Sequence, residues 1–168
     1  MSFSNIQTVI REGRLEFMRY FTMKTHGNVP LPITKKNEGE EVVLTSGLSR
    51  FSDIDYDVRC ELISERLKQL MEMFMPKYNF VPVVYLDIHN KSQLVFFRFR
   101  PPFFEDCMAS FGNDGTVSHI TFAGANAPLV FTVRSPKGIR SIIVSMAVGE
   151  SALRRKILGV EFNQVTDD

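Results

Sequence analysis

The sequence has few of the residues that mark common kinds of functional site. It contains only two cysteines, Cys60 and Cys107, which lie far apart and belong to no close-spaced metal or redox motif. This usage is typical of a reducing intracellular compartment. The formal net charge is only +1, so overall charge gives no reason to expect binding to nucleic acid or to an anionic membrane. Any such binding would need charge segregated onto one face.

Long apolar runs are also missing. No segment approaches the roughly 20 apolar residues that a membrane-spanning helix needs, and the amino-terminal residues lack the basic start and apolar stretch of a secretion signal. We therefore expect a soluble intracellular protein with no membrane partner. The 168 residues are 44 % hydrophobic and include 15 phenylalanines, enough for one domain with a substantial core.

No motif for catalysis or for cofactor or metal binding stands out. The three histidines are dispersed, and no glycine-rich phosphate-binding loop occurs. Cys107, His119 and a nearby aspartate are the closest approach to a nucleophilic set, but Cys107 falls on an apolar stripe, which favours burial. The sequence predicts a protein that is not an enzyme, with no metal, cofactor or small-molecule ligand.

Alternating apolar residues predict most of the β-structure. We expect a strand over residues 14–24, a hairpin over 80–100, and three strands between Thr116 and Val148. The last two of these three strands flank Ser-Pro-Lys-Gly at 135–138, which is typical of a tight turn. The three strands therefore predict an antiparallel meander.

Apolar residues spaced three and four apart predict the helices. The longer helix is expected to follow a cap at Ser52 and Asp53 and to end before Pro76, and a shorter helix is expected within 103–111. Residues 152–158 could add one or two further helical turns. The order of elements predicts an α+β fold in which one long and one short helix lie on one face of an antiparallel sheet.

Composition divides the chain into four parts. Residues 1–26 form a strand region, and 27–50, with its prolines, lysines and glutamates, is predicted to be an exposed connector. Residues 51–160 carry the α+β domain. The acidic end, 161–168, is predicted to be a flexible tail.

Several segments together resemble a known family. They are Leu94-Val-Phe-Phe-Arg-Phe-Arg100, Phe103 to Phe111, Ser118-His-Ile-Thr-Phe122, Ala127 to Val133 and Ser141 to Val148. In this order they resemble the C-terminal half of a sliding-clamp domain of the PCNA type, and most closely the Rad-nine subunit of the checkpoint clamp. Residues 14–26 look like the final strand of a preceding clamp domain.

The resemblance implies a non-catalytic scaffold of the DNA-damage checkpoint, which associates with partner subunits around double-stranded DNA in the nucleus. In such clamps the helices face the central hole, and basic side chains contact phosphates without reading the base sequence. The residues that would do so here are Arg59, Arg66 and Lys77, which the helical spacing places on one side of the long helix. The alternative interpretation of these residues is an ordinary solvated face, because glutamates are interspersed among them.

The resemblance also implies that subunits pair through strand edges. The closing strand and the strand that precedes the connector would form these edges. The candidate residues are Ser141, Ile143, Ser145, Arg19 and Tyr20. A second hypothesis stays open, namely a small α+β structural or assembly protein, such as a viral one, that self-associates through the same edges and has no role on DNA.

Overall fold

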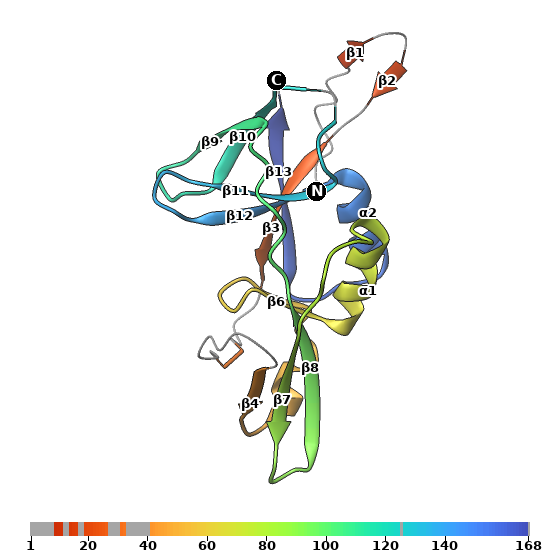
Figure 1. The fold of residues 1–168 in the computed structure, drawn as a ribbon, viewed down its shortest axis with the longest axis vertical. Helices are drawn as coiled ribbons and strands as arrows, with labels where there is room; N and C mark the ends of the chain where they lie inside the picture. Colours follow the sequence, from red (N-terminus) through yellow and green to blue (C-terminus); the bar gives the residue numbers. More distant parts are fainter. Residues whose placement is uncertain are drawn as a thin grey trace.

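The computed structural model describes residues 9–11, 14–16, 19–26, 31–32, 41–124 and 126–167 (Figure 1). This part of the chain has an α+β fold with mostly antiparallel sheets and two α-helices, α1 (Glu65–Phe74) and α2 (Met146–Arg154). The predicted fold class is therefore confirmed at this level. The helices have nearly equal lengths of 10 and 9 residues, so the predicted contrast between a long and a short helix is wrong.

The strands form two sheets and a separate hairpin. The hairpin joins β1 (Val9–Arg11) to β2 (Arg14–Glu16). The six-stranded sheet contains, in spatial order, β11 (Val130–Arg134), β12 (Arg140–Ser145), β3 (Tyr20–Thr25), β13 (Val160–Asp167), β10 (Val117–Phe122) and β9 (Cys107–Phe111). The five-stranded sheet contains β4 (Glu41–Leu44), β7 (Pro82–Asp87), β8 (Ser92–Arg98), β6 (Leu62–Ser64) and β5 (Tyr56–Asp57). A short 3-10 helix, η1 (Leu48–Phe51), follows β4.

The two sheets are built on the same plan. In each sheet, a helix connects two strands that run parallel to each other: α1 connects β6 to β7, and α2 connects β12 to β13. A third strand lies between these two and is antiparallel to both. This middle strand is β8 in the first unit and β3 in the second. The next strand outward is parallel in both sheets, since β4 pairs with β7 and β10 with β13. The units differ in where the middle strand comes from. Strand β8 directly follows β7 in the chain, whereas β3 lies far upstream of β12 and β13.

Both helices begin in the same way. Each follows its strand through a single extended serine, Ser64 with φ −70° and ψ 166° and Ser145 with φ −70° and ψ 162°. The Ser64 hydroxyl accepts a hydrogen bond from the amide of Leu67 at 3.1 Å and so caps α1. The Ser145 hydroxyl is buried and makes no hydrogen bond within the described residues.

This contrast leads to a prediction for two matched substitutions. Ser64→Ala should lower the free energy of unfolding by about 1–2 kcal/mol, because it leaves the first turn of α1 without its cap and removes a hydrogen-bond donor to the Asp55 carboxylate. Ser145→Ala should be close to neutral, because it removes a buried hydroxyl that makes no bond. Urea unfolding of both variants measures the difference. Equal losses of stability would contradict the assignment of the cap.

The main core lies between the helices and the two sheets. Leu67 and Met71 of α1 and Val148 of α2 are completely buried, and they join a cluster that includes Met23 of the six-stranded sheet and Ile63 of the five-stranded sheet. Figure 1 shows both helices together on one flank of the molecule, where the two sheets meet. The helices therefore connect the two repeated units through one shared core.

The six-stranded sheet has a second core on its other face, built around aromatic rings. The Phe131 ring lies 5.8 Å from that of Tyr20, 5.3 Å from that of Phe104 and 6.0 Å from that of Phe122, measured between centroids. Phe131 is 0 % exposed. Both faces of this sheet are therefore packed.

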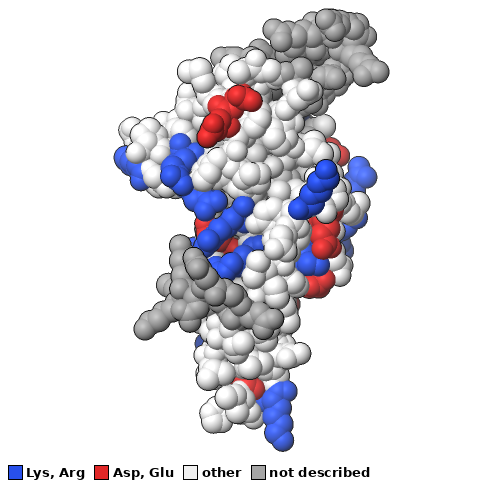
Figure 2. Space-filling view, in the orientation of Figure 1, with Lys and Arg blue, Asp and Glu red and all other residues white. Residues whose placement is uncertain are grey.

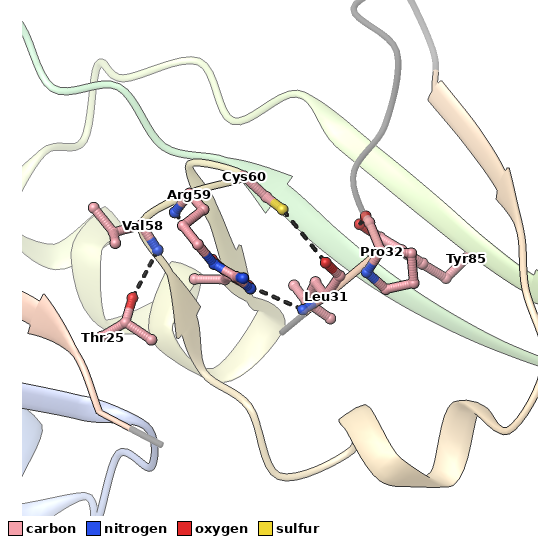
Figure 3. A network of polar contacts seen from close by, with 8 residues as sticks. Thr25, Leu31, Pro32, Val58, Arg59, Cys60 and Tyr85 are labelled. Atoms are coloured by element: carbon pink, nitrogen blue, oxygen red, sulfur yellow. Dashed lines mark hydrogen bonds and ion pairs between the residues drawn. The ribbon is translucent and has the colours of Figure 1, made fainter. Parts of the chain in front are cut away.

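A third core covers one face of the five-stranded sheet, and the stretch between β3 and β4 contributes to it. Leu31 is 2 % exposed, and its amide donates a hydrogen bond to Asp57 Oδ2 at 3.0 Å. The Tyr85 hydroxyl donates to the carbonyl of Pro32 at 3.0 Å. Figure 3 shows Leu31 and Pro32 held between Cys60 and Tyr85.

Asp87, at the end of β7, holds two loops of this sheet together. Its carboxylate accepts hydrogen bonds from the side chain and amide of Asn90 at 2.8 and 3.0 Å, and from the amide of Gly47 at 2.8 Å. The side-chain bond from Asn90 and the two amide bonds lower the pKa of Asp87 to about 2.

A pH dependence of stability follows. The folded-state pKa of Asp87 lies below the unfolded value of about 3.9, so the stabilisation is complete above about pH 4 and is lost as the pH falls towards 2. The wild-type protein should be more stable than Asp87→Asn near neutral pH, and the two should converge near pH 2. Urea midpoints measured at intervals between pH 6 and pH 2 test this. A constant difference across that range would show that the carboxylate charge contributes nothing.

Several predicted elements are confirmed. The hairpin predicted over 80–100 is formed by β7 and β8. The tight turn at 135–138 joins β11 to β12, with the Gly138 amide donating to the Ser135 carbonyl at 2.9 Å and Gly138 at φ +82°. The single strand predicted over 14–24 is confirmed only in part, because β2 at 14–16 and β3 at 20–25 belong to different sheets, and residues 17 and 18 lie outside the described part.

The longer predicted helix is present but starts later than predicted, and the shorter predicted helix is absent. The long helix begins at Glu65 rather than after Ser52 and Asp53, because β5 and β6 come first. The shorter helix does not exist, since Cys107 to Phe111 form β9. Its apolar residues fit both helical spacing and strand alternation, and pairing with β10 decides between the two.

The predicted meander is also incorrect. Its three strands exist as β10, β11 and β12, but β10 pairs with β9 and β13 instead of β11. The last strand ends at Ser145, and Val148 belongs to α2. This helix covers 146–154, earlier than the helical turns expected at 152–158.

Two of the predicted chain divisions need correction. Most of the segment predicted to be a flexible tail, 161–168, belongs to strand β13 (Val160–Asp167) between β3 and β10, and residue 168 lies outside the described part. The predicted connector, 27–50, contains β4 and the buried residues Leu31 and Leu48, while 27–30 and 33–40 lie outside the described residues.

Candidate interaction sites

The basic residues predicted to contact DNA do not form one stripe. Arg59 precedes the helix, in the turn between β5 and β6, whereas Arg66 lies in the first turn of α1. Arg59 binds Asp57 through two nitrogens, at 2.8 and 3.3 Å, and Arg66 forms an ion pair with Asp55. Because both aspartates are buried, each arginine neutralises a buried carboxylate. Lys77, just beyond α1, is exposed.

The residues predicted to form subunit edges lie on internal strands. Strand β12, with Ser141, Ile143 and Ser145, pairs with β11 on one side and β3 on the other. Strand β3, which begins at Tyr20, pairs with β12 and β13, and the Arg19 carbonyl accepts a bond from the Met146 amide at 2.7 Å. These strands have no open edge for another subunit, so the prediction is wrong.

The outer strands of the two sheets are β11, β9, β4 and β5. One of these edges is already covered. The segment 101–104 runs parallel to β11, where the Thr132 amide donates to the Pro102 carbonyl at 2.9 Å and the Phe104 amide donates to the Thr132 carbonyl at 3.1 Å. Prolines at 101 and 102 lack amide hydrogens and suit this position, because they cannot extend the sheet further.

One face of the five-stranded sheet carries an uncovered set of aliphatic side chains, here called the aliphatic face. Cross-strand pairing places Val42, Val84 and Val95 in one row, and Leu44 beside Leu86 in the next. Ile88, the first residue of the turn that follows β7, is exposed at the end of this face. The aliphatic face thus consists of Val42, Leu44, Val84, Leu86, Ile88 and Val95.

The aliphatic face is exposed because α1 covers only one end of the sheet. Ile63 and Phe97 lie on the same side and are buried beneath the helix. Farther along, Val42 is 59 % exposed, Leu44 66 % and Ile88 67 %. Figure 2 shows few charged side chains over the lower part of the molecule, where β7 and β8 lie, except near the tip of the hairpin. Contiguous exposed apolar side chains of this kind mark interaction sites.

The six-stranded sheet has a groove at its other outer strand, here called the seam groove. One wall consists of Cys107, Ala109 and Phe111 of β9, and the other of Phe103, Val133 and Arg134. The walls are joined where the chain turns at 105 and 106. The volume is about 510 Å³, within the range of ligand sites. The sequence did not indicate this groove, because residues 103–111 matched a helical pattern.

Arginines gather around the mouth of the seam groove. The guanidinium carbons of Arg134 and Arg140 lie 4.5 and 5.0 Å from the centroid of the Phe103 ring. Arg140 also binds Glu61 at 3.0 Å, and Glu61 pairs with Arg100. In Figure 2, Lys and Arg side chains are concentrated around the middle of the molecule.

Both cysteine thiols are partly buried. Burial raises the pKa of Cys107, with a further contribution from Asp106, and burial raises the pKa of Cys60 to about 11. The Cys107 thiol donates to the Phe104 carbonyl at 3.3 Å. Within the described ranges, no group of three or more histidine, cysteine, aspartate or glutamate side chains is placed to hold a metal ion.

No protein-family model matches the chain, and no curated protein matches it. The helices of the described part are all too short and too polar to cross a membrane.

Proposed function

We propose that the protein is a non-catalytic assembly protein that associates with further copies of itself through the aliphatic face. The observation that carries this proposal is the exposure of Val42 and Leu44, which share one face of β4, on a sheet that α1 covers only in part. Burying such side chains in an interface is favourable, at about 25 cal/mol for each Å² of apolar surface removed from water.

The chemistry of the face favours a second copy as the occupant. The six side chains are aliphatic and Gln93, which pairs with Leu86 on the same face, is uncharged, so two copies can stack sheet on sheet without placing like charges opposite each other. Strand β4, which carries Val42 and Leu44 of this face, is also an outer strand of the sheet, so its free edge can contribute main-chain pairing. The sequence also leaves self-association open as a hypothesis, but through the segments that form β12 and β3. We place the contact on the five-stranded sheet instead.

Sedimentation equilibrium tests the proposal. The wild-type protein should form dimers or larger oligomers at micromolar concentrations, and Leu44→Lys should shift it to monomer. Met108→Lys is the matched control, because Met108 is 80 % exposed on β9 in the other sheet. Circular dichroism should be unchanged in both variants. A wild-type protein that stays monomeric at several hundred micromolar would refute self-association.

A clamp-type scaffold around DNA in the nucleus, joined to other clamp subunits, is the second candidate. The resemblance of residues 94–148 and the duplicated unit of helix and sheet favour it, because the clamp fold is also built from repeated units. Lys77 is the most suitable probe, since Arg59 and Arg66 also stabilise the fold through Asp57 and Asp55. Binding to double-stranded DNA should weaken with salt and in Lys77→Glu. No binding at low salt would remove this candidate.

A further inference from the structure

Strand β9 is the uncovered outer strand of the six-stranded sheet. It pairs with β10 from Cys107 to Phe111, and the described residues provide no strand on its other side. In an antiparallel pair, alternate residues direct their N–H and C=O groups away from the partner strand. The opposite outer strand, β11, differs in this respect, because segment 101–104 already binds its main chain. One side of this sheet is therefore closed and the other is open.

The seam groove gives this open edge a shaped surface. Cys107, Ala109 and Phe111 of β9 point into the groove, whereas Met108, between them, is 80 % exposed on the other side of the strand. An added strand would therefore place every second side chain in the groove, against Phe103 and Val133. The small Ala109 leaves room at the centre of the wall.

Two charged side chains, Arg134 and Glu105, line the groove. Arg134 is exposed, and its guanidinium rests on the Phe103 ring at 4.5 Å. No carboxylate of the described residues forms an ion pair with Arg134, in contrast to Arg140, which binds Glu61. Stacking on the ring restricts the guanidinium before any partner arrives, which lowers the entropy that is lost on binding. This favours an anionic group opposite Arg134.

We propose that the seam groove binds an extended segment of a partner protein, which adds to β9 as a further strand and pairs an acidic side chain with Arg134. Main-chain bonds to β9 hold the segment, apolar side chains at alternate positions fill the groove, and the carboxylate on Arg134 sets the direction and register. This site is separate from the aliphatic face and does not depend on self-association.

Hydrogen exchange with a designed probe tests the proposal. The probe is an acetylated and amidated octapeptide with threonine at one set of alternate positions, and with valine at the centre and aspartate at the ends of the other set, which faces the groove. Binding should slow amide exchange in residues 107–111 and leave β4 unchanged. The same peptide with N-methyl groups along one edge should give no protection, because it cannot pair as a strand.

Charge exchange at Arg134 provides the second measurement. By fluorescence anisotropy, Arg134→Glu should weaken binding of the aspartate peptide roughly tenfold and strengthen binding of the same peptide with lysine in place of aspartate. Met108→Arg is the matched control on the outer side of β9 and should bind like the wild type. The proposal is overturned if millimolar peptide leaves exchange in 107–111 unchanged, or if both peptides bind equally to the wild type and to Arg134→Glu. Leu44→Lys should retain peptide binding, which separates this result from the test of self-association.

Discussion

Replacing Asp55 by alanine should lower the free energy of unfolding by about 3–5 kcal/mol, as expected when one partner of a buried ion pair is removed. Asp55 is 4 % exposed. Its carboxylate accepts hydrogen bonds from the Ser64 hydroxyl, the Arg66 guanidinium and the Leu158 amide. The substitution would leave all three donors without their acceptor.

The position of Asp55 explains why the loss should be large. Its own amide donates to the Leu158 carbonyl at 3.1 Å, and its carbonyl accepts from the Ser64 amide at 2.9 Å. One residue thus connects the strand before α1, the first turn of α1 and the segment that follows α2. The two repeated units are joined here by polar contacts as well as by the shared core.

Urea unfolding followed by circular dichroism measures the effect. Asp53→Ala is the matched control, because Asp53 is exposed two residues away and should change stability by less than about 0.5 kcal/mol. Asp55→Asn tests the charge separately, since it keeps the shape of the side chain. If Asp55→Ala cost no more than Asp53→Ala, the network would contribute nothing to stability.

Phe131→Ala should cost a similar amount, about 3–5 kcal/mol, for a different reason. The ring is completely buried among the rings of Tyr20, Phe104 and Phe122, so its removal leaves a cavity that these large neighbours cannot fill. Because natural domains are stable by only about 5–15 kcal/mol, a loss of this size threatens folding near body temperature.

Thermal and urea unfolding measure this loss, with Phe103→Ala as the control. Phe103 is 42 % exposed and lies outside the aromatic cluster, so its removal should cost much less. Phe131→Leu should recover part of the lost stability, because it refills some of the volume. Equal destabilisation by Phe103→Ala and Phe131→Ala would contradict the placement of the second core.

Local patterns predicted local structure well. The hairpin over 80–100 and the turn at 135–138 depend on alternation and turn chemistry between neighbouring segments, and both are present. Pro76 marks the end of α1 within two residues. The start of α1 was missed because Ser52 and Asp53 are as suitable for a cap as Ser64, and only the pairing of β6 with β8 distinguishes them.

Structure that depends on distant partners was not predictable in this way. Strand β13 has an acidic end that looks like a tail, but Phe162 pairs with Met23 across most of the chain. The apolar residues of β9 also fit helical spacing, and only the pairing with β10 shows that this segment is a strand. The interaction sites were missed for the same reason, because the seam groove needs β9 as a strand and the aliphatic face needs β4 beside β7.

The position of β3 has a consequence for how the protein is made. The strands of the five-stranded sheet and helix α1 come only from residues 41–98, so these strands can pair before the later residues are synthesised, and the core shared with α2 forms afterwards. Strand β3 is synthesised before all of them, yet both of its neighbours, β12 and β13, come from residues 140–167. Contacts of such long sequence separation form slowly. Until β12 and β13 are synthesised, β3 has no partner strand and its residues Tyr20 and Met23 are exposed. During synthesis, β3 therefore stays without its partner strands for longer than the strands of the five-stranded sheet.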